Sequence, residues 1–126
     1  NDSNVTVMNT ASNQKLAVLR THNLPFRVKF TPNGKFVAVS NGLSGNVSMY
    51  DAKEKRLIRD IDVTAEPGTD AVPVGIDVHT DSNYYFVCTS GYNQVAVLDI
   101  QNGMLLKRID TGKEPDGIAF SKVELK

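Results

Sequence analysis

The sequence has very little cysteine, no tryptophan and no excess of either charge. Its single cysteine, Cys88, excludes an intrachain disulfide framework and a cysteine-based zinc site. The 126 residues include 14 basic and 14 acidic side chains, so the chain lacks the basic footprint of a nucleic-acid-binding protein. No apolar run approaches the roughly 18 to 20 residues that cross a bilayer. The 40% of hydrophobic residues is typical of a globular chain.

The given sequence begins at Asn1 rather than at a methionine, and its first residues do not read as a secretory signal. We therefore expect a processed form, a fragment or an engineered protein. The lone cysteine leaves the redox compartment open.

The sequence does contain an internal repeat. One six-residue segment occurs three times, at 4–9 (NVTVMN), 46–51 (NVSMYD) and 94–99 (QVAVLD). The first step is 42 residues and the second is 48. The six extra residues lie in the polar stretch 64–72, since the segment 73–76 (PVGI) returns as 115–118 (PDGI) after 42 residues again. A period near 40 indicates an array of small units that bury their apolar faces against one another.

Each unit is predicted to form four short antiparallel strands. In the unit that begins at Pro25, residues 26–30 alternate apolar and polar side chains, as a half-buried strand does. Residues 36–40 are apolar on both faces, which is typical of a central strand. Residues 47–51 follow as the third strand, and residues 57–63, which include Arg59, Asp60 and Asp62, follow as the outer strand.

Four antiparallel strands with the charged strand outside describe one blade of a β-propeller. We therefore predict an all-β fold with eleven strands and no helix. The chain 1–126 should be a single partial β-propeller, an incomplete ring of two full blades and two part blades. The predicted divisions are a part blade at 1–24, blades at 25–64 and 73–112, and a part blade at 115–126.

Several motifs in these units follow one pattern. They are 31–35 (TPNGK) at the first turn, 38–41 (AVSN) and 86–89 (FVCT) on the second strand, 95–99 (VAVLD) on the third, and 115–121 (PDGIAFS) at the opening of a unit. On these motifs the chain resembles the YVTN-repeat β-propellers, named for a Tyr-Val-Thr-Asn tetrapeptide on the second strand. The pattern is broken at 80–83 (TDSN), which lacks the turn glycine, and again after Ser121.

The resemblance is to surface-layer-like and lactonase-like seven-bladed propellers, and it implies a secreted, periplasmic or cell-surface location. It favours a non-enzymatic scaffold that mediates protein or surface interactions through its blade loops. A fragment of a propeller enzyme stays open as the alternative, either a lactonase-like hydrolase or a quinone- or haem-dependent dehydrogenase subunit. We place no catalytic residue, no metal ligand set and no cofactor on this chain, and fold analogy alone does not supply them.

About three blades cannot close a ring, because known propellers have at least four. Unpaired strand edges invite pairing with other chains. The expected partners are therefore a second copy of the chain, in a homo-oligomer that completes a propeller of six blades, or the missing blades of a longer chain. In the first arrangement, residues 115–121 and a short strand at Val123–Leu125 would join the N-terminal strands of the other copy. A separate protein partner is also compatible with the open loops.

Five residues are candidates for ligand or partner binding. Glu66 and Asp70 lie in the insertion, and a loop longer than its neighbours is often functional, although it can also be a tolerated surface insertion. Asp77 and Asp116 lie on or near inner strands, where paired carboxylates could hold a cation or act in acid–base catalysis; solvated strand ends are the alternative. His79 ends an inner strand, and it is either a metal or haem ligand or a hydrogen-bonded surface histidine, because no second ligand follows at a suitable spacing.

Overall fold

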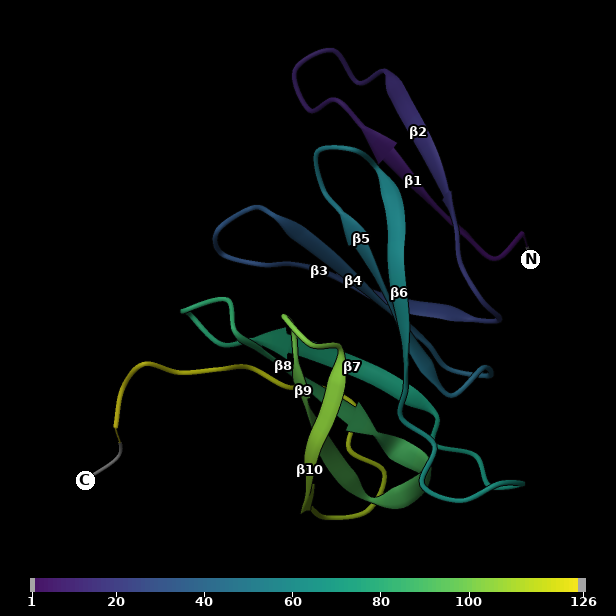
Figure 1. Cartoon of the computed structure of the whole chain (residues 1–126), viewed down its shortest axis with the longest axis vertical. Coiled ribbons are helices and arrows are strands. Elements are labelled where there is room, and N and C mark those ends of the chain that lie inside the picture. Colours follow the sequence, from purple (N-terminus) through teal and green to yellow (C-terminus); the bar gives the residue numbers. More distant parts are fainter. Residues whose placement is uncertain (1, 125–126) are drawn as a thin grey trace.

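The computed structural model describes residues 2–124 and is all-β. Within that range, ten strands form three antiparallel sheets that are stacked side by side (Figure 1). The part blade consists of β1 (Asn4–Met8) and β2 (Lys15–Arg20). The middle blade consists of β3 (Pro25–Phe30), β4 (Phe36–Asn41), β5 (Asn46–Asp51) and β6 (Arg56–Asp62). The last blade consists of β7 (Pro73–Val78), β8 (Tyr84–Thr89), β9 (Gln94–Asp99) and β10 (Met104–Asp110).

Each four-stranded sheet is a meander in which every strand pairs with the next one along the chain. The strand order runs β3-β4-β5-β6 in the middle blade, and β7-β8-β9-β10 in the last blade. These are the two full blades that the repeat predicts, and β1 with β2 supplies the third and outer strands of a part blade. The fold class predicted from the sequence is therefore confirmed.

The backbone follows the repeat in its unusual conformations as well as in its strands. The residue before each repeat-opening proline has a left-handed backbone, with φ of 57° at Leu24, 47° at Val72 and 50° at Glu114. A residue before proline normally favours extended conformations, and a β-branched residue such as Val72 disfavours positive φ. The carbonyl of Leu24 accepts a hydrogen bond from the Gly42 amide at 2.8 Å, and that of Val72 accepts one from the Ser90 amide at 3.1 Å. These bonds fasten the connection between blades to a turn within the following blade, and they offset part of the strain.

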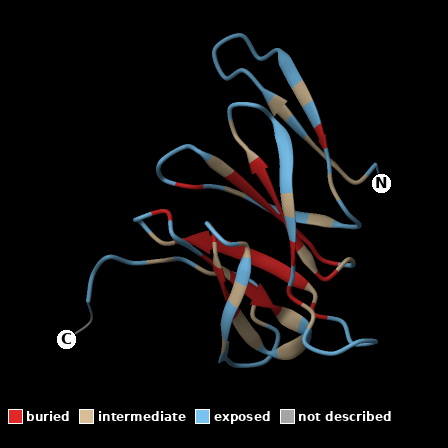
Figure 2. Cartoon of the chain, in the orientation of Figure 1, coloured by how far each residue is buried: buried red, intermediate tan, exposed pale blue. Residues whose placement is uncertain are grey.

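The main core lies between the middle blade and the last blade. Figure 2 shows the buried residues concentrated in the inner strand β7 and in the middle strands of the two full blades, whereas the outer strands β6 and β10 are largely exposed. The middle blade contributes Ala38, Val47, Met49 and Ile61, and the last blade contributes Ile76, Val78, Tyr85, Val87 and Leu98. A smaller cluster of Leu19, Val37, Val39 and Tyr50 joins the part blade to the middle blade. Each blade is thus stabilised by its neighbour, as expected for a repeat protein.

The predicted eleventh strand is wrong for the described residues. Residues 115–124 form no strand, because the second strand that would pair with them is absent from residues 2–124. The segment instead lies along β7, where the carbonyl of Asp116 occupies the space beside Gly75 that a Cβ atom would fill. The predicted short strand at Val123–Leu125 is likewise not formed as far as residue 124, and Leu125 lies outside the described residues.

The expectation of no helix is also wrong in one detail. A single 3-10 turn, Ser90–Tyr92, connects β8 to β9 and ends at Asn93, which has a φ of 56°. Its Tyr92 has a role in the candidate site described below. In the part of the chain that the structure covers, we find no helix long and apolar enough to cross a membrane.

Candidate functional site

The connection 63–72 joins β6 to β7 and is held in place by residues of the last blade. The hydroxyl of Tyr92 accepts a hydrogen bond from the Ala65 amide at 3.1 Å and lies 2.5 Å from the hydroxyl of Thr69. Arg108 donates to the carbonyl of Val63 at 2.8 Å and stacks its guanidinium 5.3 Å from the centre of the Tyr92 ring. The connection is therefore an ordered loop rather than a loose insertion.

A close backbone approach fixes the far end of the same loop. A Cβ atom on Gly91 would lie 1.9 Å from the carbonyl oxygen of Asp70, so only glycine fits at this contact. Residues 65–70 are all exposed, including Glu66 and Asp70. Asp70 also borders a small hollow beside Leu43, a side chain that is 72% exposed at the turn between β4 and β5. The loop thus holds two carboxylates toward solvent on a rigid base, which suits a contact with a partner.

Asp77 lies on β7 and connects three consecutive inner segments of the array. Its Oδ1 accepts from the Lys29 ammonium on β3 at 2.7 Å and from the Val78 amide at 2.9 Å. Its Oδ2 accepts from the Phe120 amide at 2.6 Å. Burial raises the pKa of Asp77, but these hydrogen bonds and the charge of Lys29 outweigh it and hold the pKa below its ordinary value. Asp77 is therefore an ionised structural group whose two oxygens are both occupied.

His79 follows β7 and lies in a local cluster. Its Nδ1 is 2.7 Å from the carboxylate of Asp81, and its ring meets the rings of Phe120 and Tyr84 edge to face, with centroids 4.5 Å and 6.2 Å away. The Asn83 amide, and secondarily His79, hold the pKa of Asp81 below its ordinary value. Among the described residues, no three His, Cys, Asp or Glu side chains gather in a group that could hold a metal ion.

Asp116 is exposed and contacts β7 through its backbone rather than its carboxylate. Burial, and then the charge of Asp116, raise the pKa of the Cys88 thiol. Cys88 is only 1% exposed, and so it is a small buried residue of the last blade. The carboxylate of Asp77 is paired with Lys29. The cation-binding or acid–base role considered for Asp77 with Asp116 stays a prediction.

The five candidate residues do not meet in one site. Glu66 and Asp70 precede β7, whereas Asp77 and His79 lie at its other end, and six residues of strand extend roughly 17 Å. The sequence reasoning missed Lys29, although Lys29 and Asp77 are equivalent in the repeat and have opposite charges. It also missed Tyr92 and Arg108, because a loop anchor leaves no local signal in the sequence.

A second polar network lies in the middle blade and was also not predicted. His22 lies 2.8 Å from one carboxylate oxygen of Asp60, and the Ser48 hydroxyl donates to the other at 2.6 Å. Asn41 continues the chain by donating to Ser48 at 2.9 Å. Each member comes from a different strand or connection, so the network ties the connection before β3 to β4, β5 and β6.

No family model matches the chain, and no curated protein matches it in sequence. Solved structures do match. Hydrazine synthase of Kuenenia stuttgartiensis is 27% identical, with a TM-score of 0.68 over 74% of this chain and 25% of that chain. AztD of Citrobacter koseri is 17% identical, with a TM-score of 0.74 over 98% of this chain and 35% of that chain. A structure of apo AztD from the same organism is 16% identical, with a TM-score of 0.74 over 92% and 32%.

The chain therefore spans about a third or less of the length of the solved proteins that it matches. At 16 to 17% identity, the likeness to AztD shows the fold and no more. The matched proteins are β-propellers, and the sheets of this chain correspond to their blades. The chain has the fold of a segment of a β-propeller.

Proposed function

We propose that the chain is part of a non-enzymatic β-propeller scaffold, which mediates protein or surface interactions through its blade loops. Its ring would be completed by further blades, from a second copy or from a longer chain. One observation carries this proposal: positions that are buried between two blades are exposed at the ends of the array. Ile61 is 3% exposed, but its repeat equivalent Ile109 is 42% exposed. Val78 is 5% exposed, but its equivalent Phe30 is 59% exposed.

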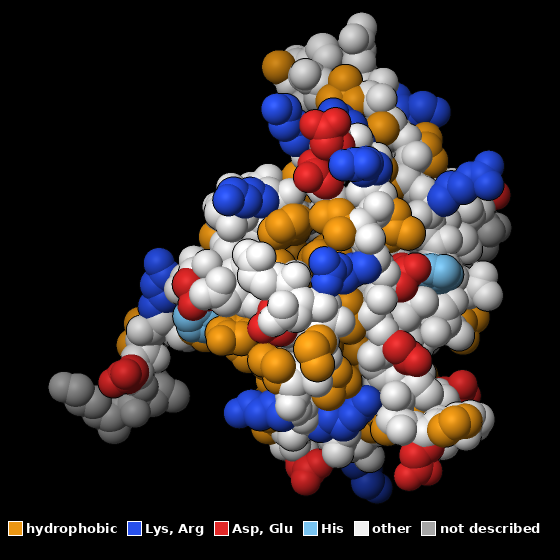
Figure 3. All heavy atoms as spheres, in the orientation of Figure 1, with side chains coloured by type: hydrophobic (Ala, Val, Ile, Leu, Met, Phe, Trp, Pro, Cys, Tyr) orange, Lys and Arg blue, Asp and Glu red, His pale blue; other side chains and the backbone are white. Residues whose placement is uncertain are grey.

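These exposed positions belong to two surfaces at opposite ends of the stack. The leading face includes Phe26, Val28 and Phe30 on β3, and the trailing face includes Ile109 on β10 and the partly buried Phe86 on β8. Figure 3 shows hydrophobic side chains reaching the surface of both four-stranded blades between charged groups. Single exposed apolar residues are found on the surface of any protein. A group of large apolar side chains, exposed at positions whose repeat equivalents are buried between blades, instead indicates an interaction surface.

The loop 63–72 is the contact that we propose for a separate partner. It is six residues longer than the corresponding connection before β3, and its exposed carboxylates stand on a base fixed by Tyr92 and Arg108. The acidic side chains Glu66 and Asp70 favour a partner that offers basic groups. A rigid loop loses little conformational entropy on binding, which supports affinity.

Membership of the YVTN-repeat family and a secreted, periplasmic or cell-surface location belong to the same proposal. Both rest on the motif resemblance, above all on 31–35 (TPNGK) and 115–121 (PDGIAFS). Export is tested by fractionating the native host and locating the protein with an antibody. Recovery from the cytoplasm alone would remove the support for this location.

The alternative is a fragment of a propeller enzyme, and one observation favours it. Hydrazine synthase, by its name an enzyme, contains a region that is 27% identical to this chain. Sequencing the complete open reading frame separates the two proposals. An attached haem-binding Cys-x-x-Cys-His segment would favour the enzyme, whereas propeller blades alone would favour the scaffold.

Light scattering across a hundredfold range of concentration tests ring completion. We expect the chain to associate as its concentration rises, and we expect Ile109→Asp to weaken this association by placing a charge on the trailing face. Leu43→Asp is the matched control, because Leu43 is 72% exposed but lies on a turn away from either face. A monomer at every concentration that unfolds cooperatively and binds no apolar dye would contradict the proposal.

A further inference from the structure

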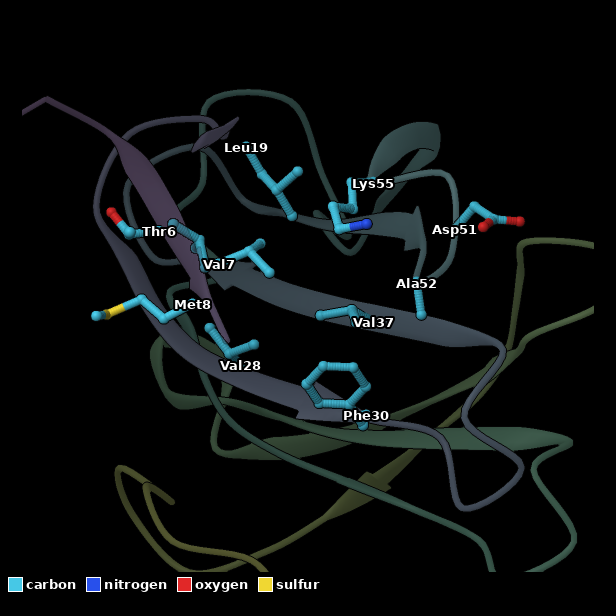
Figure 4. A pocket seen from close by; sticks show the side chains of 11 residues that line it. Thr6, Val7, Met8, Leu19, Val28, Phe30, Val37, Asp51, Ala52 and Lys55 are labelled. Atoms are coloured by element: carbon cyan, nitrogen blue, oxygen red, sulfur yellow. The ribbon is translucent and has the colours of Figure 1, made fainter. Parts of the chain in front are cut away.

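A groove of about 180 Å³ lies between the part blade and the inner strands of the middle blade (Figure 4). Its walls are mainly apolar. They include Val5, Val7 and Leu19 of the part blade and Val28, Phe30 and Val37 of the middle blade. Asp51 and Lys55, from the β5–β6 turn region, also border it, and Thr6 of β1 adds a hydroxyl at the opposite wall, so the polar groups are few. The groove therefore suits an apolar occupant rather than a charged small molecule.

An unpaired strand edge borders the same groove. β1 pairs with β2 on one edge, and no described strand pairs with its other edge. In the middle blade the equivalent strand β5 is paired on both edges, with β6 on one and β4 on the other. An extended chain could add to the free edge of β1 as β4 adds to β5, because unpaired backbone groups template a further strand.

The internal repeat shows what fills the equivalent place one blade further along. Val28 and Phe30 on β3 are equivalent to Ile76 and Val78 on β7, which are 7% and 5% exposed. Those two side chains are covered by the middle blade, including Ala38 of β4, and β3 runs beside β7. The hairpin β3–β4 therefore covers these side chains on β7, whereas no equivalent hairpin among the described residues covers Val28 and Phe30 on β3.

We propose that this groove and the free edge of β1 together bind a β-hairpin equivalent to β3–β4, supplied by another polypeptide segment. One strand of the hairpin pairs antiparallel with β1, and the other runs beside β3. At β7, the small side chain of Ala38 helps to cover Val78. Phe30 is larger than its equivalent Val78 and leaves less space, so the pairing strand presents small or β-branched apolar side chains toward it. This inference rests on the proposed propeller scaffold and specifies what completes its leading face.

The test uses the hairpin that the chain itself provides. A copy of residues 25–45 is fused in place of residues 1–3, so that the added Gly45 meets Asn4 as the native Gly45 meets Asn46. We expect hydrogen exchange of the β1 amides to slow by about tenfold or more, because the free edge becomes paired. The matched control has Val39→Pro in the added copy only, which removes a ladder donor and should abolish the protection.

Two substitutions in the body of the chain locate the binding surface. Phe30→Asp on the native β3 should remove the protection, whereas Ile109→Asp on the trailing face should leave it intact. Loss of protection with Ile109→Asp as well would show docking of whole copies end to end, and it would overturn the hairpin proposal. The same 25–45 hairpin is also added as a free peptide to the unmodified chain. If neither the fused nor the free hairpin protects β1, the proposal is wrong, while association through Ile109 would still support the scaffold.

Discussion

Ile61 and Ile109 provide a matched pair within one molecule, because they occupy the same position of β6 and β10. Ile61 is packed between the middle blade and the last blade and is 3% exposed. Ile109 is 42% exposed on the trailing face. We predict that Ile61→Ala destabilises the chain much more than Ile109→Ala does. The chemistry of the two substitutions is identical, so the difference reports only on what covers each site.

The magnitude follows from the two exposures. Truncating a fully buried isoleucine to alanine costs about 2 to 5 kcal/mol, which includes the cavity that is left behind. At Ile109 water fills the space, so the cavity contribution is lost. Only part of the roughly 1.5 to 3 kcal/mol for burying such a side chain remains there, about 1 kcal/mol. The free energy of unfolding should therefore fall by about 2 kcal/mol more for Ile61→Ala than for Ile109→Ala.

Urea unfolding at one low protein concentration measures both costs. Repeating it at a hundredfold higher concentration adds a second comparison. If further copies cover the trailing face, the cost of Ile109→Ala should rise toward that of Ile61→Ala, because association stabilises the folded state by mass action. Equal costs at low concentration would refute the reasoning, since they would mean that Ile109 is already covered or that Ile61 is not packed.

Three further substitutions test individual contacts. Asp77→Asn should remove a stabilisation that is complete at neutral pH in the native chain. In the native chain this stabilisation begins to be lost when the pH falls below about 4, which is the pKa of the carboxyl in the unfolded chain, and it is lost completely once the pH is below the lower pKa of the folded state. Urea unfolding at a series of pH values from 7 to 2 measures the loss. Tyr85→Phe should leave stability unchanged or raise it by about 1 kcal/mol in thermal unfolding, because its buried hydroxyl has no partner in the described chain. Gly75→Ala should release residues 115–121 to hydrogen exchange, since its Cβ would meet the Asp116 carbonyl, whereas Gly117→Ala, with open space around it, should not.

The blades could be predicted from the sequence because their signals are local and occur more than once. The alternation in β3 and the continuous apolar run in β4 each identify a strand without knowledge of the rest of the fold. The repeat then fixes the order of the strands. The segment 115–121 has the same local pattern as β3 and β7, yet it forms no strand, because strand formation needs a partner and none is present among residues 2–124. The local sequence pattern therefore predicts the strands of the two full blades, but it does not predict the conformation of the last segment of the array.

The candidate site was only partly predictable for a related reason. The insertion 64–72 is visible as a change of period, and residues 65–70 within it are exposed. The ion pair of Asp77 with Lys29 could have been predicted, because neighbouring inner strands place these two residues side by side. The hydrogen bond from the Phe120 amide could not, since it depends on the path of a segment after the last strand. Asp77 pairs with Lys29 and with two amides, because a buried carboxylate is stabilised by a cation and by hydrogen-bond donors rather than by a second carboxylate.

Comparison of the units with one another separates what the fold requires from what is free to vary. Interface positions keep their apolar character from unit to unit, as Val47 and Val95 show. The charge of the inner strand does not persist: one repeat position is Lys29, then Asp77, then Ala119. The connections differ too, since the one before β7 is six residues longer than the one before β3. The middle and last blades both fold, although one carries Lys29 and the other Asp77 and their connections differ in length, so packing does not impose these choices. The inner-strand charges and the loop 63–72 are therefore two features by which this protein can differ from another stack of blades.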